Sequence, residues 1–274
     1  MGEIVLDTLR EIPEWMLTDL QRYAILAVGV WLILWVGLAG ILRHRKIRKE
    51  WPPREQLLVE FAHSLRSIAI FSVLSVSTYF MWRAGLLPWA SVNEQMTGPI
   101  WFWGSVALML VAHDAYFYWV HRWMHDPKRF RLYHRRHHRS MNPSPFTAYS
   151  FDLREAGLMV LFVILWEIAV PNPPGATGTF VIISLIKNTL GHSGFELMPA
   201  TKDRRPMFDW FTTTVHHDLH HARAGYNFGL YFTWWDKWMG TEDPTYYDEF
   251  KRVVDQRRLA RAEAKSPAAE PALG

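Results

Sequence analysis

Histidine is the residue type in this 274-residue chain whose number and spacing indicate a chemical role. There are 13 histidines, and most of them fall into short groups. The spacing of His121 and His125 places both side chains on one face of a helix. Two further groups follow the pattern H-x2-HH, which on a helix would present three imidazoles on one stripe. Their members are His134, His137 and His138, and then His217, His220 and His221.

Metal binding explains this gathering better than chance does. Imidazoles that bind nothing would repel one another whenever they are protonated, with an ordinary pKa near ~6.5. The chain has no cysteine, which excludes thiolate zinc sites, Fe–S clusters and cysteine nucleophiles. The histidines of these three groups outnumber the four ligands that one tetrahedral zinc ion uses, so the sequence predicts two metal ions. Imidazole alone does not select iron over zinc, copper or nickel.

Long apolar segments must position these histidines. Residues 24–42, 68–90 and 100–120 each approach the ~20 residues that cross a bilayer, and they predict three spans. Residues 156–170 and 176–191 flank a turn rich in proline, and at ~1.5 Å per residue each is too short to cross. They predict a short helical hairpin that dips into the membrane or crosses it at an incline.

Basic residues predict the orientation. The segments 43–49 and 122–139 are rich in Lys and Arg, which favours the cytoplasmic side. The expected fold is therefore an all-α integral-membrane helical bundle, three long spans plus the hairpin, with a cytoplasmic His-rich helical cap. We expect residues 1–98 to hold membrane spans and a basic loop, 99–245 a di-metal domain, and 246–274 a basic helix and a disordered tail from residue 265.

Several motifs together resemble the fatty acid hydroxylase/sterol desaturase superfamily of membrane di-iron enzymes. Residues 114–125 resemble the first motif of that family, and HRRHHRSMNP at 134–143 resembles the second. HSGFE at 192–196, HHDLHH at 216–221, NFG at 227–229 and WWDKWMGT at 234–241 follow in the expected order. The resemblance covers roughly residues 100 to 241.

The resemblance implies a set of metal ligands and no further catalytic residue. The ligands are His121, His125, His134, His137, His138, His192, His217, His220 and His221. Asn188 stands where some relatives have a histidine, and His216 is a possible outer ligand. Asp114 and Asp218 are candidates to accept the free N–H of a ligating imidazole.

The resemblance also implies the chemistry. Such enzymes use two iron ions, O2 and two electrons to hydroxylate an unactivated C–H bond of a lipid-like substrate, such as a fatty acyl chain, a sphingolipid or a sterol. A desaturase on the same site is the alternative. We expect the substrate to enter from the bilayer and the electrons to come from a cytochrome b5- or ferredoxin-type donor. We expect no nucleic-acid partner.

Two readings of another class compete with the oxygenase. A metal transporter would place ligands and carboxylates along a path near mid-membrane, whereas the dense histidine groups lie at one side. A zinc-dependent membrane hydrolase would usually show H-E-x-x-H, which is missing from the sequence. For localisation, we expect a multi-pass protein of a bacterial inner membrane rather than of the endoplasmic reticulum, with a cytoplasmic active site.

Overall fold

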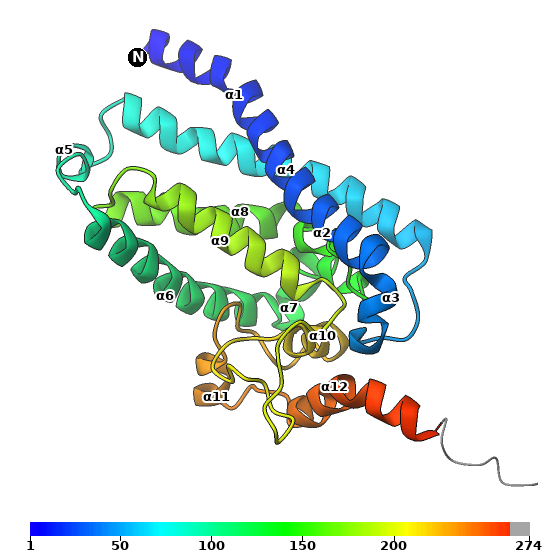
Figure 1. Ribbon diagram of the computed structural model, residues 1–274. Coiled ribbons are helices and arrows are strands. Elements are labelled where there is room, and N and C mark those ends of the chain that lie inside the picture. The colour runs from blue at the N-terminus through cyan, green and yellow to red at the C-terminus, as the bar shows by residue number, and fades with distance from the viewer. Residues whose placement is uncertain (264–274) are drawn as a thin grey trace, which may run out of the picture.

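The structure, a computed structural model, describes residues 1–263 as a bundle of helices (Figure 1). The only strand-like pairings among these residues are isolated bridges, so the all-α prediction is confirmed. Helices α4, α6, α8 and α9 run along one another, and α10, α11 and α12 gather beyond one end of the bundle. The tail expected from residue 265 lies outside the described residues, and the predicted division at residues 98 and 245 stays a prediction.

Three helices are long and apolar enough to cross a membrane, as predicted. The first runs over Gly2–Gly37 and comprises α1 (Gly2–Tyr23), α2 (Gly29–Trp31) and the wider π-type turns Ala24–Val28 and Leu32–Gly37. The others are α4 (Arg54–Arg83) and α6 (Pro99–Met124). Short helices α3 (Ala39–Leu42) and α5 (Ala90–Asn93) follow the first and the second of them.

The first long helix begins well before residues 24–42, where the sequence predicts a span. The acidic residues of α1 do not interrupt it, and two of them contact α4. Asp7 pairs with Arg83 at 3.3 Å, and Asp19 accepts a hydrogen bond from Ser72 at 2.8 Å. The apolar face of α1 instead points outward, with Leu6 and other leucines exposed. Exposed leucines on α1, with hydrogen bonds to α4 on its other side, are typical of a helix that faces lipid.

The predicted hairpin consists of α8 (Leu153–Ala169) and α9 (Ala176–Gly191). At ~1.5 Å per residue its helices are about 25 Å long, shorter than the ~30 Å apolar core of a bilayer. Gly175 in the turn has φ +83°, a conformation that glycine adopts without strain. Met109 of α6, Phe162 of α8 and Phe180 of α9 form a common buried cluster. The hairpin is therefore held as part of the bundle.

The cap contains α7 (Pro127–Tyr133), α10 (Thr214–Ala222), α11 (Trp234–Met239) and α12 (Tyr246–Glu263). Val215 and Leu219 of α10 pack against Tyr246 and Phe250 of α12 in a buried cluster. The loop after the first long helix joins this cap through Ile47, which belongs to the same cluster. The cap is thus packed against the loop that follows the first long helix, although the two are remote in sequence.

A tight turn after α9 brings the cap against the first long helix. Gly194 has φ +75°, and its carbonyl oxygen accepts a hydrogen bond from the Ile47 amide at 3.1 Å. A Cβ atom at this position would lie 3.3 Å from the Pro143 carbonyl oxygen and 3.4 Å from the Trp35 ring. Both the backbone conformation and the space therefore require glycine here.

We expect Gly194→Ala to destabilise the fold by about 1–2 kcal/mol, because an L side chain is strained at positive φ. Gly191→Ala is the matched control, since its Cβ would lie in a helix and meet nothing within 4 Å. Thermal unfolding of the purified proteins in detergent measures both. Equal unfolding temperatures for the two variants would contradict the prediction.

Candidate metal centre

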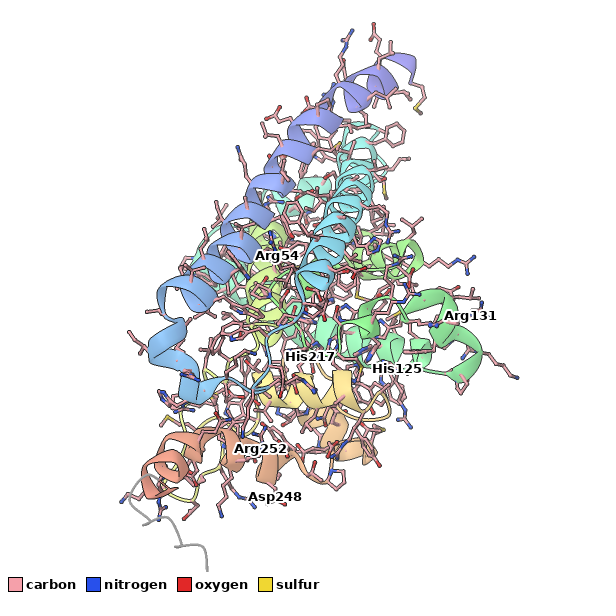
Figure 2. The ribbon with its side chains drawn as sticks, turned by 90° about the vertical axis from the view of Figure 1, so that its right-hand side faces the viewer. Arg54, His125, Arg131, His217, Asp248 and Arg252 are labelled. Atoms are coloured by element: carbon pink, nitrogen blue, oxygen red, sulfur yellow. The ribbon has the colours of Figure 1, made fainter. Side chains whose placement is uncertain are left out.

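Nine histidine side chains meet where the long helices end and the cap begins. The first histidine group comprises His121, His125, His134, His138 and His220, and the second comprises His137, His192, His217 and His221. Within each group, the candidate ligand atoms all lie within 4.8 Å of one another. Eight of the nine are buried, and His125 is partly buried. Figure 2 shows His125 and His217 in the interior, with Asp248 and Arg252 of α12 beyond them.

Each group draws its members from several distant segments. The last turn of α6, the segment after α7 and α10 supply the first group. The 3-10 turn His137–Arg139, the end of α9 and α10 supply the second. Both groups therefore exist only when the cap is packed onto the membrane helices.

The two H-x2-HH triplets are each divided between the groups, contrary to the expectation of one stripe for each. His134 and His138 join the first group and His137 the second, because α7 ends at Tyr133 and the chain continues in a 3-10 turn. In α10, His220 belongs to the first group, while His217 and His221 belong to the second. Each triplet thus bridges the two groups.

Main-chain carbonyl groups determine the tautomer of three of these histidines. The Nδ1 atoms of His121, His192 and His220 lie 2.9, 2.8 and 2.6 Å from carbonyl oxygens. The oxygens belong to Phe228, Asn188 and Tyr226, respectively. A carbonyl oxygen can only accept, so Nδ1 carries the proton. In a neutral imidazole, Nε2 then presents a lone pair.

These lone pairs face other ring nitrogens. Nε2 of His121 lies 2.9 Å from Nε2 of His134, and Nε2 of His192 lies 2.8 Å from Nε2 of His217. Burial, and then the neighbouring imidazoles, hold the pKa of His217 and His220 well below its usual value, so these rings are neutral. Two nitrogens bound at ~2.1 Å to one metal at a right angle lie about 3 Å apart. The spacing and the donor set therefore fit a cation in each group.

The family model described as fatty acid hydroxylase matches residues 106–241, which contain all nine histidines. The chain belongs to this family. Cholesterol 25-hydroxylase of Mus musculus is 26% identical over 73% of this chain and 66% of its own length. The Delta(7)-sterol 5(6)-desaturase of Gibberella zeae is 26% identical over 78% of this chain and 67% of its own length.

A third relative, matched over a smaller share of its own length, has another activity in its name. The very-long-chain aldehyde decarbonylase of Oryza sativa subsp. indica is 27% identical over 61% of this chain and 28% of its own length. The chain spans about two thirds of the length of the cholesterol and sterol enzymes that it matches. No solved structure matches the chain. Family and relatives together indicate an oxidoreductase in a multi-pass membrane setting.

Two segments that match the family's motifs, 227–229 and 234–241, hold the surroundings of His121 in place. Asp236 accepts hydrogen bonds from the amides of Phe228 and Gly229, each at 2.8 Å, and from the Thr241 hydroxyl. This holds the loop whose Phe228 carbonyl orients His121. Burial raises the pKa of Asp236 to about 6.

Asp114 and Asp218 have partners other than the histidine rings. Asp114 accepts the main-chain amides of Tyr231 and Phe232, at 2.8 and 3.2 Å. Asp218 accepts two hydrogen bonds from the Arg48 guanidinium, each 3.0 Å long. Both carboxylates therefore fasten the cap to other segments, rather than accepting an imidazole N–H as expected.

His216 and Asn188 lie beside the groups. His216 is fully buried outside both, with Nε2 3.8 Å from an Asp236 oxygen. The side-chain amide of Asn188 donates to the Ala148 carbonyl at 2.6 Å, while its own main-chain carbonyl holds His192. Both contact the surroundings of the histidines, and neither supplies an atom to the two groups.

Glu155, in the first turn of α8, is the site residue that the sequence analysis misses. Its Oε1 atom lies 2.6 Å from Nδ1 of His134, and the residue is 1% exposed. A carboxylate in this position orients the ring and makes its other nitrogen a stronger ligand. The available signal is an acid in the first turn of a mostly apolar helix, outside every histidine motif.

We expect Glu155→Gln to weaken metal binding by about 10–100-fold, because an amide beside Nδ1 makes the His134 ring a weaker ligand than a carboxylate does. Metal titration of the detergent-purified protein measures this, with Asp203→Asn, an exposed acid outside both histidine groups, as the control. Equal affinity in the Glu155 variant and the wild type would show that the contact does not tune the site.

Proposed function

We propose that the chain is a membrane di-iron oxygenase that uses O2 and two electrons to hydroxylate an unactivated C–H bond of a lipid-like substrate. The observation that carries the proposal is the pair of buried, neutral imidazole groups whose lone pairs converge. The nine histidines of the two groups are the proposed ligands. The hydroxylase and desaturase names among the relatives support oxidation of a fatty acyl, sphingolipid or sterol substrate.

Two iron ions held there would supply O2 activation and the oxidising power for C–H cleavage. The residues of the chain supply the rest. The carbonyls of Phe228, Asn188 and Tyr226 hold three rings in the ligating tautomer. Glu155 holds a fourth ring, and burial excludes water from the reacting centre.

A cavity of about 380 Å³ provides the proposed substrate chamber. It is lined mainly by the first long helix, α4, α6, α8 and α9, and most of its lining is apolar. Asn188 and Leu230 line it, and they also line a small hollow that includes His217. The proposed route from the cavity to the second histidine group therefore passes Asn188 and Leu230. The size of the cavity suits a ligand that arrives from the bilayer.

The cap is the proposed docking side for the electron donor, a cytochrome b5- or ferredoxin-type protein. The basic residues of 128–139 and of the loop 43–49 belong to this side of the molecule, which we assign to the cytoplasm. Opposite charges on the two proteins would favour their encounter. A bacterial inner membrane remains the proposed location.

Desaturation on the same site is the second candidate, and the Gibberella zeae relative supports it. Hydroxylation and desaturation share the first hydrogen abstraction, so the histidine geometry serves both. Mass spectrometry of the product separates them, since one outcome adds an oxygen atom and the other removes two hydrogens.

We expect His137→Ala and His220→Ala, one from each group, to lose activity and to bind less metal than the wild type. Metal content after anaerobic iron loading, together with Mössbauer spectra, measures this. His63→Ala is the control, because His63 contacts Arg136 outside both groups. One tightly bound zinc ion that iron cannot displace would contradict the oxygenase proposal.

We expect Val181→Trp to lower turnover at least about tenfold without loss of metal, because the larger ring fills the cavity. Val181 lines the cavity, whereas its neighbour Ile182 is exposed on the outside of α9. Ile182→Trp is therefore the matched control. Full activity in Val181→Trp would place the substrate elsewhere.

A further inference from the structure

The far end of the cavity contains an acid that the proposed chemistry does not use. Glu167, on the last turns of α8, lines the cavity together with Thr177 at the start of α9. The turn between these helices lies at the end of the bundle opposite α10 (Figure 1). An ionisable side chain inside a membrane bundle is costly and is usually kept for a function.

We propose that Glu167 binds a hydroxyl group of the substrate, so that the carbon at the other end of an elongated apolar alcohol meets the metal centre. This inference rests on the proposed function, because it takes the cavity to be the substrate chamber. It adds a binding subsite and a substrate class, which the histidine geometry by itself does not provide.

Glu167 can still accept a hydrogen bond at this end of the cavity. The Thr177 hydroxyl donates to Oε1 of Glu167 and is itself approached by the Asn172 amide. Oε2 of Glu167 has no hydrogen-bond partner among the described residues. Asp19, the other acid of the lining, differs, since Arg22 and Ser72 occupy both of its oxygens.

An uncharged donor fits this environment best. A carboxylate or phosphate group would be repelled by Glu167, and an isolated charge is costly to move into apolar surroundings. An alcohol costs much less to take out of water than a charge does, and its hydroxyl can donate directly to the free oxygen. Hydrogen bonds to charged acceptors are also the stronger kind.

The hairpin turn alone does not account for the acid. The main-chain amide of Asn172 donates to Asn93, and its side-chain amide donates to Thr177, which ties the turn to the end of α5. A neutral acceptor at position 167 would serve Thr177 equally well. The structural role therefore explains Thr177 and Asn172, but not a carboxylate with one oxygen open to the cavity.

Both walls of the cavity give the same length for the ligand. On α8, Glu155 touches His134 and Glu167 lies 12 residues further on, about 18 Å along the axis. On α9, Asn188 holds His192 and Thr177 lies 11 residues earlier, about 17 Å along the axis. The reacting carbon should therefore lie roughly 17 Å from the hydroxyl group.

The test is a competition between 1-hexadecanol and hexadecane, which differ only in the hydroxyl. The full-length protein in detergent is equilibrated with an equimolar mixture, without O2 or electron donor, then washed and extracted for gas chromatography. We expect the wild type to retain the alcohol over the alkane by about tenfold. We expect Glu167→Leu to bring this ratio close to one.

Three further variants make the result specific. Glu94→Leu, an exposed acid in the loop at the same end, should keep the tenfold ratio. Val181→Trp should lower the bound amount of both ligands, and unchanged amounts would overturn the proposal by locating them outside the cavity. If Glu167→Leu does not fold, Glu167→Gln decides, with an expected ratio of about threefold, because neutral hydrogen bonds are weaker.

A tenfold ratio that persists in the Glu167 variants overturns the subsite, as does a wild-type ratio near one. Neither result bears on the metal centre, since nothing turns over in the assay. Conversely, a protein that binds zinc instead of iron would still show the ratio. The subsite and the oxygenase proposal can therefore fail separately.

Discussion

The lone pairs of buried imidazoles impose the main constraint on this molecule. Rings whose Nδ1 atoms are committed to carbonyl oxygens must point Nε2 inward, and these nitrogens repel one another unless a cation lies among them. Much of the cap serves to hold that arrangement. Asp236 supports the Phe228 loop, and α12 supports α10. Contacts far from the histidines thus determine where their nitrogens lie.

In the membrane helices, several polar groups face the interior of the bundle and many apolar groups face outward. Asp7 and Asp19 of α1 contact α4, while several leucines of α1 are exposed, as expected where a helix faces lipid. The same inversion leaves a mostly apolar cavity with a few polar points along its walls. Substrate orientation can then depend on very few hydrogen bonds, because water does not compete with them.

Local patterns made most of the fold predictable from the sequence. Apolar stretches identify the three long helices and the hairpin, since length and composition are local properties. The histidine spacings identify the side chains that the structure brings together. The start of the first helix is missed because the partner of Asp7, Arg83, is remote in sequence. The division of each triplet is missed because α7 ends at Tyr133, and Glu155 because its contact with His134 is tertiary.

The position of α10 in the chain has a consequence for assembly. It supplies His220 to one group and His217 and His221 to the other, after every membrane helix has been synthesised. Neither group can be complete while the ribosome is still translating the hairpin. A cation that needs all the ligands of either group would therefore bind only after the hairpin has been synthesised. The segment that completes both groups is thus the last part of the site to leave the ribosome.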